Sequence, residues 1–287
     1  MNSSGTLISA AKLASLLDHP RLRLVDCRFD LADRQAGRRA YEAGHLPGAV
    51  YAHLDEDLAA AVTPATGRHP LPDPDAFADT LGSWGIDRHS QVVVYDGGAG
   101  AIAARLWWML RWLNHTQVAV LDGGFAAWSK LGAATVPGVH HNAEARFDPA
   151  PRPDMIMDRL QVVDGLAAGT LVLIDVRARL RYLGEIEPLD KVAGHIPGAL
   201  NLPFEENLDQ EGRFQLPRNL ERKYEEIRKA HPGKHICFMC GSGVTACHGL
   251  LAMEIAGLPG ARLYPGSWSE WIADAALPIA IGEEATR

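Results

Sequence analysis

The feature that most constrains this chain is an internal duplication. Four short motifs of the first half return in the same order in the second half, roughly 140–150 residues further on. The spacing drifts from one motif to the next, as changes in loop length between two copies of one unit would produce. The pairs are Asp26-Cys27-Arg28 with Asp175-Val176-Arg177, Gly44 to Ala49 with Gly194 to Ala199, Val92 to Tyr95 with Ile236 to Met239, and Gly123 to Trp128 with Gly266 to Trp271.

Each copy alternates short apolar runs with longer segments of helical periodicity. In the first half the strand-like runs are 22–25, 91–95 and 118–121, and the helix-like segments are 6–17, 77–84 and 101–113. In the second half the strand-like runs are 171–174 and 236–239, and a helix-like segment covers 244–255. This alternation predicts α/β domains, each a mainly parallel sheet flanked by helices.

The duplication also predicts the domain boundaries. A chain of 287 residues allows two domains that each form a core of their own. We expect these domains at residues 1–137 and 159–287. Residues 138–158 contain Pro149, Pro151 and Pro153, which is typical of a linker.

Cys240 stands where a buried strand of the second copy meets a helix. The apolar run from Ile236 to Met239 ends at this cysteine, and a loop with Gly241 and Gly243 leads into the helical segment. The glycines let backbone N–H groups curl inward, and the positive end of the helix dipole adds to them. Such a turn stabilises a thiolate and lowers the cysteine pKa, so Cys240 is the predicted nucleophile.

The first copy supports this prediction because it has Asp96 at the position of Cys240. If Cys240 were purely structural, the difference between the two copies at this position would be due to chance alone. Cys237 and Cys247 occupy apolar positions of the pattern and are predicted to be buried structural side chains. Four cysteines in a chain of this length, three of them crowded near residue 240, do not make a disulfide framework and fit a reducing compartment.

Composition excludes several other classes of protein. The chain is 47% hydrophobic and 22% charged, as soluble globular proteins are, and its net charge of −7 gives no support to nucleic-acid binding. No apolar run approaches the roughly 18 residues of a membrane span, and the polar start is no signal peptide, so we expect a cytoplasmic protein. His140-His141 lacks a second ligand pair and Gly97 to Gly100 lacks the lysine of a phosphate loop, so neither a metal nor a cofactor is expected.

Together these motifs resemble the two-domain rhodanese family, the thiosulfate and 3-mercaptopyruvate sulfurtransferases. The resemblance covers nearly the whole chain, through Asp-x-Arg and Gly-His-Ile/Leu-Pro-Gly-Ala in each half, the cysteine loop in the second half, and Gly266 to Trp271. It implies two tandem rhodanese-like domains, a persulfide on Cys240, a catalytically silent first domain, and a site that faces residues 30 to 70. The implied partners are a small-molecule sulfur donor and a thiol acceptor such as thioredoxin or glutathione, and we expect a monomer.

The loop after Cys240 resembles the mercaptopyruvate type. Thiosulfate-preferring relatives carry basic residues there, which suit a dianion, whereas this loop adds no cation. A monoanionic thiol acid is thus the expected donor, with thiosulfate as the alternative, and the resemblance implies that Arg181 binds its carboxylate. The second arginine usual in that subgroup is missing from residues 184–191. The loop residues expected to contact the substrate are Gly241, Gly243, Val244 and Thr245.

The resemblance further implies a proton relay. In the mercaptopyruvate subgroup the serine two residues after the cysteine is proposed to work with a histidine and an aspartate from the first domain. Ser242 matches the serine and His45 the histidine. Ala36 occupies the approximate place of the aspartate, so Asp33 is only the nearest candidate. Because its duplicate His195 lies in the same turn motif, a purely structural role for His45 stays open.

Three rival interpretations remain. A cysteine phosphatase needs an arginine six residues after its cysteine, and Ala246 stands there. A thiol-disulfide oxidoreductase would use Cys237 with Cys240, but Cys237 falls inside the strand run, where its thiol would point away from the turn. A non-catalytic binding module is the third, and a persulfide label on Cys240 would exclude it.

Overall fold

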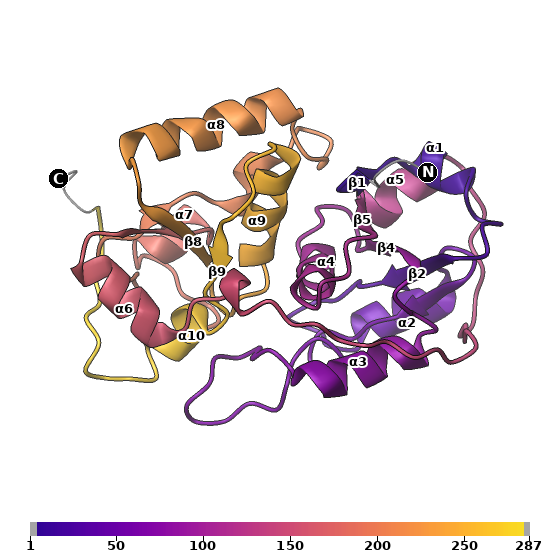
Figure 1. Cartoon of the computed structure of the whole chain (residues 1–287), viewed down its shortest axis with the longest axis horizontal. Coiled ribbons are helices and arrows are strands. Elements are labelled where there is room, and N and C mark those ends of the chain that lie inside the picture. Colours follow the sequence, from indigo (N-terminus) through magenta and orange to yellow (C-terminus); the bar gives the residue numbers. More distant parts are fainter. Residues whose placement is uncertain (1–4, 284–287) are drawn as a thin grey trace. The chain divides into compact units, whose positions relative to one another are not determined.

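The computed structural model describes residues 5–283, which form two compact units (Figure 1). Unit 1 comprises the chain up to Ala60, Leu71–Arg152 and Leu208–Phe214, and unit 2 comprises Ala61–Pro70, Pro153–Asn207 and the chain from Gln215. The chain passes from unit 1 to unit 2 after Arg152, inside the stretch predicted as a linker. Two short segments are exchanged, however: Ala61–Pro70 from the first half of the chain belongs to unit 2, and Leu208–Phe214 from the second half belongs to unit 1. The spacing of the motifs does not predict this exchange.

Unit 1 is built on a five-stranded sheet with the strand order β1-β5-β4-β2-β3. Every neighbouring pair is parallel, and the central strand β4 pairs Val93 with Leu24 of β2 and with Ala119 of β5. The apolar residues of β4 are buried, as both faces of a parallel sheet require. The strands are β1 (Leu7–Ile8), β2 (Leu22–Asp26), β3 (Ala49–Tyr51), β4 (Gln91–Tyr95) and β5 (Val118–Leu121).

Five α-helices accompany this sheet in the described part of unit 1. They are α1 (Ala10–Ala14), α2 (Ala36–Ala43), α3 (Pro74–Ser83), α4 (Ala103–Trp112) and α5 (Gly124–Lys130). The carboxylate of Asp73 accepts hydrogen bonds from the first amides of α3, and Pro74 follows it, which is a favourable helix start. α4 is buried nearly all round, and its three tryptophans belong to the core.

The helix expected over residues 6–17 is wrong in its first part. Leu7 and Ile8 form an edge strand that pairs with Val120 and Leu121 of β5. The helix α1 begins only after Ser9, whose hydroxyl accepts a hydrogen bond from the Lys12 amide at 3.3 Å. The apolar spacing fits a helix, but the open edge of β5 satisfies the backbone groups of the first residues better.

Unit 2 repeats the architecture with a four-stranded parallel sheet in the order β7-β6-β8-β9. The strands are β6 (Leu171–Asp175), β7 (Leu200–Asn201), β8 (His235–Met239) and β9 (Arg262–Leu263). Its helices are η1 (Pro153–Met155), α6 (Arg159–Ala167), α7 (Arg179–Tyr182), η2 (Phe204–Asn207), α8 (Pro217–Ala230), α9 (Ala246–Ile255) and α10 (Ser267–Trp271). The prediction of two α/β units with parallel sheets is confirmed.

The core of unit 2 packs the sheet against aromatic residues from α10. Leu173 of β6 and Cys237 of β8 lie in one cluster with Trp268 and Trp271, all fully or almost fully buried. Across residues 5–283, no helix has both the length and the apolar character needed to cross a bilayer, and the longest, α8, has 14 residues.

The duplicated Asp-x-Arg motif is a structural clamp in both units. Arg28 binds the carboxylate of Asp26 at the end of β2 and donates to the carbonyl of Gly44 at 2.7 Å. Arg177 makes the same pair of contacts with Asp175 and Gly194, also at 2.7 Å. Each arginine therefore ties the end of an inner strand to the Gly-His turn, and this shared role explains why both copies carry the motif.

Candidate active site

Cys240 follows the last residue of β8 and opens the loop that leads into α9. Its side chain is almost fully buried, with 2% of the residue exposed. Its backbone is held from both sides, because its N–H donates to the Ser267 hydroxyl at 3.1 Å and its carbonyl accepts from the Trp268 amide at 3.0 Å. Ser267 holds this position with a positive φ of 53°, a strained conformation for a residue with a side chain. The start of α10 thus fixes where the thiol lies.

The loop needs its glycines for different reasons. Gly243 has a φ of +77°, and a Cβ there would collide with the carbonyl oxygen of Pro265. At Gly241, a Cβ would lie 2.9 Å from Nη2 of Arg68 and 3.4 Å from Nη2 of Arg181. The absence of a side chain at Gly241 therefore lets two guanidinium groups approach the residue next to Cys240.

Unit 1 shows what such a loop binds. The carboxylate of Asp96, at the position of Cys240, accepts four backbone N–H bonds from the loop after β4. The donors are Gly98, Gly100, Ile102 and Ala103, at 2.9 to 3.2 Å. A loop of this kind is a cradle for an anion carried by the residue that ends the strand.

The corresponding loop of unit 2 keeps amide groups available. Within the part of the chain that the structure describes, the N–H groups of Ser242, Val244 and Thr245 have no hydrogen-bond acceptor. Val244 is buried and Thr245 directly precedes α9 without a side-chain cap. These amides and the start of a ten-residue helix suit a negative charge on Cys240.

Ser242 hydrogen-bonds to a histidine that the sequence does not single out. The Ser242 hydroxyl lies 2.7 Å from Nδ1 of His69, and both residues are buried. His69 belongs to the segment Ala61–Pro70, which packs as part of unit 2. The family resemblance points to the region of residues 30 to 70, but His69 has no repeat partner and no periodic pattern around it. Only the tertiary contact reveals it.

His45, the predicted partner of Ser242, makes the contacts of a structural residue. Its Nδ1 lies 2.9 Å from the carbonyl of Tyr41, and its ring stacks on the Tyr41 ring. The duplicate His195 does the same with Tyr182, at 2.7 Å. Because both units share this turn, the same contacts of His45 and His195 have a common structural explanation. A catalytic role of His45 stays a prediction.

Asp33, the predicted aspartate, lies on the exposed surface of unit 1. Its carboxylate pairs with Arg39, and the hydrogen bond from that arginine holds the pKa of Asp33 below its usual range. Within unit 1, His45 is not among its partners. Its part in catalysis stays a prediction without a supporting contact.

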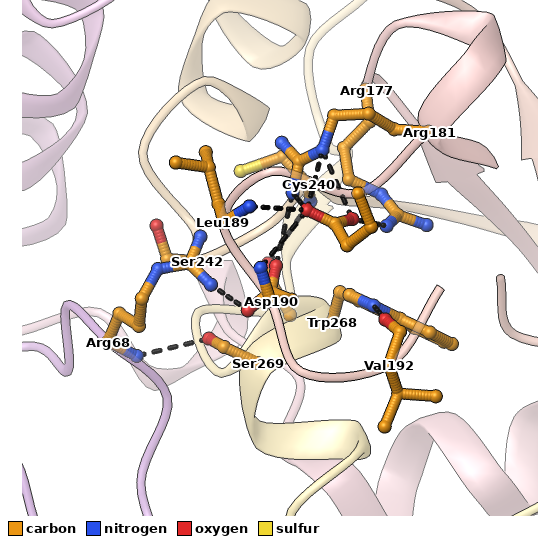
Figure 2. Close-up of polar contacts among 12 residues, drawn as sticks. Arg68, Arg177, Arg181, Leu189, Asp190, Val192, Cys240, Ser242, Trp268 and Ser269 are labelled. Carbon is orange, nitrogen blue, oxygen red and sulfur yellow. Dashed lines mark hydrogen bonds and ion pairs between the residues drawn. The ribbon is translucent and has the colours of Figure 1, made fainter. Parts of the chain in front are cut away.

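Arg181, the predicted substrate arginine, does lie beside the cysteine loop, in α7. Its guanidinium binds Glu187 at 2.8 Å and Asp190 at 3.1 Å, and Asp190 also pairs with Arg68 (Figure 2). The backbone of Arg68 is fixed in turn, because its N–H donates to the Ser269 hydroxyl at 3.0 Å. Burial lowers the pKa of the Arg68 guanidinium, and the nearby charge of Cys240 opposes that shift. Unit 2 thus brings two arginines to the loop of Cys240.

The other cysteines have the buried settings that the pattern predicts. Cys237 lies inside β8 in the core of unit 2, and burial raises the pKa of its thiol. Cys247 lies in α9, and its thiol contacts the Gly243 carbonyl at 3.4 Å. A thiol kept protonated inside a strand is a poor redox partner, which disfavours the oxidoreductase interpretation. Among residues 5–283, no group of three histidine, cysteine or acidic side chains is arranged to hold a metal ion.

Comparisons with known proteins agree with the duplicated fold. The family model described as a rhodanese-like domain matches residues 9–131 and again residues 159–274. A Pseudomonas aeruginosa protein named probable 3-mercaptopyruvate sulfurtransferase is 46% identical over 98% of this chain and 100% of its own length. A Mycobacterium tuberculosis relative, named provisionally as the thiosulfate sulfurtransferase SseB, is 36% identical over 96% of this chain and 97% of its own.

Among solved structures, the crystal structure of SseA from Escherichia coli, a 3-mercaptopyruvate sulfotransferase by its published description, has the same fold. It superimposes with a TM-score of 0.80 at 31% identity, covering 93% of this chain and 100% of SseA. The duplicated motifs, the two parallel sheets and these matches lead to one conclusion. The chain belongs to the rhodanese family and contains two rhodanese-like domains.

Proposed function

We propose that this protein is a 3-mercaptopyruvate sulfurtransferase in which Cys240 carries the sulfur atom. One observation supports the proposal above the others: the Cys240 loop combines available backbone amides, a buried Ser242–His69 pair and two arginines. Amides suit a thiolate or a persulfide, the serine–histidine pair suits proton transfer, and arginines suit the carboxylate of the donor. The names of the relatives agree with this reaction.

The proposed reaction has two halves. In the first, the Cys240 thiolate attacks the sulfur of 3-mercaptopyruvate, and the carbon–sulfur bond breaks. The bonding electrons pass to the carbon, giving the enolate of pyruvate and a persulfide on Cys240. The enolate takes up one proton and the persulfide loses one, so the balance of protons closes without an outside acid. In the second half, a nucleophile removes the outer sulfur and restores the thiolate.

The Ser242–His69 pair is placed to manage that proton. At 2.7 Å the serine hydroxyl and the imidazole share a hydrogen bond, and its burial keeps bulk water from competing. We assign proton transfer to Ser242 with His69, in place of the pairing with His45 that the sequence suggests.

The acceptor and the cellular setting belong to the same proposal. Cyanide serves as acceptor in an assay, and a cellular thiol such as thioredoxin or glutathione serves in its place. Four free cysteines, and no disulfide among them, suit a reducing compartment such as the cytoplasm, where those thiols are abundant. We expect a monomer.

The test is to incubate the protein with 3-mercaptopyruvate without an acceptor, digest it, and search by mass spectrometry for one added sulfur on the Cys240 peptide. We expect the persulfide there, and ping-pong kinetics with cyanide. Parallel specificity constants for thiosulfate identify the preferred donor, and we expect mercaptopyruvate to exceed it. Ternary-complex kinetics with no persulfide would refute the proposal, and a larger constant for thiosulfate would make the protein a thiosulfate sulfurtransferase.

A further inference from the structure

Ser267 holds a backbone conformation that its duplicate in unit 1 reaches with a glycine. Its φ is +53°, in the left-handed region that residues with a side chain rarely adopt, and the φ of Gly124 at the equivalent position is +54°. The residues before them differ, since Gly123 has a φ of +76° and Gly266 a φ of −63°. Both turns still arrive at the same conformation, so a glycine fits this position and a serine is strained there.

The helices that begin here bind the preceding strand in the same way. In unit 1, the N–H of Phe125 donates to the carbonyl of Asp96 at 2.8 Å. In unit 2, the N–H of Trp268 donates to the carbonyl of Cys240 at 3.0 Å. Because this contact is common to both units, the loop after β4 and the loop after β8 can be compared relative to it.

The glycine in unit 1 leaves space for the loop after β4 to close. A Cβ on Gly124 would stand 2.5 Å from the carbonyl oxygen of Asp96 and 2.8 Å from the backbone nitrogen of Gly98. This nitrogen is one of the four that donate to the Asp96 carboxylate, at 3.0 Å. The loop therefore reaches its anion through space that a side chain on residue 124 would fill.

Unit 2 has a side chain at that place. Real Cβ atoms do not come as close to backbone atoms as a Cβ on Gly124 would, because interiors are packed at van der Waals distances. Ser242 is the residue equivalent to Gly98, so Ser267 keeps its backbone farther from the start of α10. In agreement, the N–H of Ser242 has no hydrogen-bond acceptor among residues 5–283.

The hydroxyl of Ser267 fixes this side chain in place. It accepts a hydrogen bond from the Cys240 N–H at 3.1 Å and donates one to the Tyr264 carbonyl at 2.9 Å. Ser267 is fully buried, so water does not compete for either bond. The two bonds offset part of the backbone strain, and they hold the Cβ against the loop that carries the thiol.

We propose that Ser267 is a positioning residue whose side chain props the Cys240 loop open, which gives the loop room for the outer sulfur of a persulfide. This inference rests on the proposed function. When the sulfur–sulfur bond forms, the carbon–sulfur bond of the donor breaks and its electrons leave on the pyruvate enolate, so the Cys240 side chain grows by one sulfur atom. The carboxylate of Asp96 never changes size, and its loop closes on it without such a prop.

The test compares Ser267→Gly with Ser267→Ala. Both variants lose the hydroxyl, but alanine keeps the Cβ and glycine removes it. Because glycine also suits the positive φ, Ser267→Gly should unfold at the same temperature as Ser267→Ala or at a higher one. Yet Ser267→Gly should lower kcat with mercaptopyruvate and cyanide by about 10- to 100-fold and leave KM within a few-fold. Ser267→Ala should keep kcat within a few-fold of the wild type.

The order of the two variants decides the inference. If Ser267 only stabilised the fold, activity would follow stability, and Ser267→Gly would be at least as active as Ser267→Ala. That result, or a Ser267→Gly protein that fails to fold beside a folded Ser267→Ala, would overturn the inference and leave the proposed function standing. If the wild-type protein forms no persulfide on Cys240, the proposed function fails and the inference fails with it.

The reciprocal substitution tests the premise in unit 1. Gly124→Ser adds a side chain against the Asp96 carbonyl and the Gly98 amide. Its matched control is Gly132→Ser, where φ is +69° and no atom of residues 5–283 lies within 4 Å of the added Cβ. Gly124→Ser should unfold at least about 5 °C below Gly132→Ser, or fail to fold while the control folds. Equal unfolding temperatures would mean that a side chain here does not keep a loop from closing, and would overturn the inference.

Discussion

The loops after β4 and after β8 occupy the same place in two copies of one fold but hold different groups. In unit 1 the loop closes on the carboxylate of Asp96, which takes four backbone amides. In unit 2 the loop surrounds Cys240, and several of its amides have no acceptor among residues 5–283. The same backbone device thus stabilises a fixed anion in one unit and is available to a reacting sulfur in the other. The difference teaches that one kind of loop can hold either a fixed carboxylate or a thiol, depending on the residue that ends the strand.

The largest effect we expect comes from removing the thiol. Cys240→Ser should lower sulfur transfer on the order of 1,000-fold or more, because an alcohol in this position neither ionises nor forms a persulfide. Steady-state rates with 3-mercaptopyruvate and cyanide measure it, and circular dichroism should show an intact fold. Cys237→Ser is the matched control, since its thiol lies inside β8, and it should keep most of the activity. Equal losses in both variants would contradict the assignment of Cys240.

The next effect concerns the cradle of unit 1. Asp96→Ala should lower the free energy of unfolding by about 3 kcal/mol or more, because four backbone donors in a buried loop lose a charged acceptor. Denaturant titration provides the measurement. Asp73→Ala removes an exposed helix cap with two amide contacts and should cost only about 1 kcal/mol. If the two variants lower the free energy of unfolding by the same amount, the four amide bonds to Asp96 stabilise the protein no more than an ordinary helix cap does.

A smaller effect separates the two histidines. His69→Asn and Ser242→Ala should each lower kcat by about 10- to 100-fold with little change in KM, as the loss of a proton relay does. His45→Asn should leave kcat nearly unchanged and instead lower stability by about 1–3 kcal/mol, since its Tyr41 contact is buried. Steady-state kinetics and thermal unfolding of the three variants distinguish a catalytic role from a structural one for each histidine. A loss of kcat in His45→Asn alone would return the catalytic role to His45.

The smallest effects compare glycines in the two loops. Gly243→Ala should destabilise the protein by about 1–3 kcal/mol, because its φ is positive and its Cβ would meet the Pro265 carbonyl. Gly97→Ala in unit 1 has no atom within 4 Å of its added Cβ and should change stability by less than about 0.5 kcal/mol. Unfolding midpoints of both variants test the contrast. A neutral Gly243→Ala would mean that the Cys240 loop is less constrained than these contacts indicate.

Much of the fold and part of the site follow from local signals. The repeat of Asp-x-Arg and Gly-His motifs gives two similar units, apolar runs such as 91–95 give their central strands, and Cys240 is found where one of those runs ends. The edge strand β1 is missed because a two-residue strand has no periodicity of its own. Arg68 and His69 are missed for a related reason: their surroundings carry no repeat and no period.

What the sequence alone determined, then, is the fold class and the duplication, and it also predicted Cys240 as the nucleophile, because each inference depends on residues that are neighbours along the chain. The tertiary structure decided which residues lie beside the Cys240 loop. Ala61–Pro70 joins the unit made by the other half of the chain and brings His69 to Ser242 and Arg68 to Asp190. Contacts between residues more than a hundred positions apart depend on the packing of the whole unit, and no local pattern of side chains encodes them.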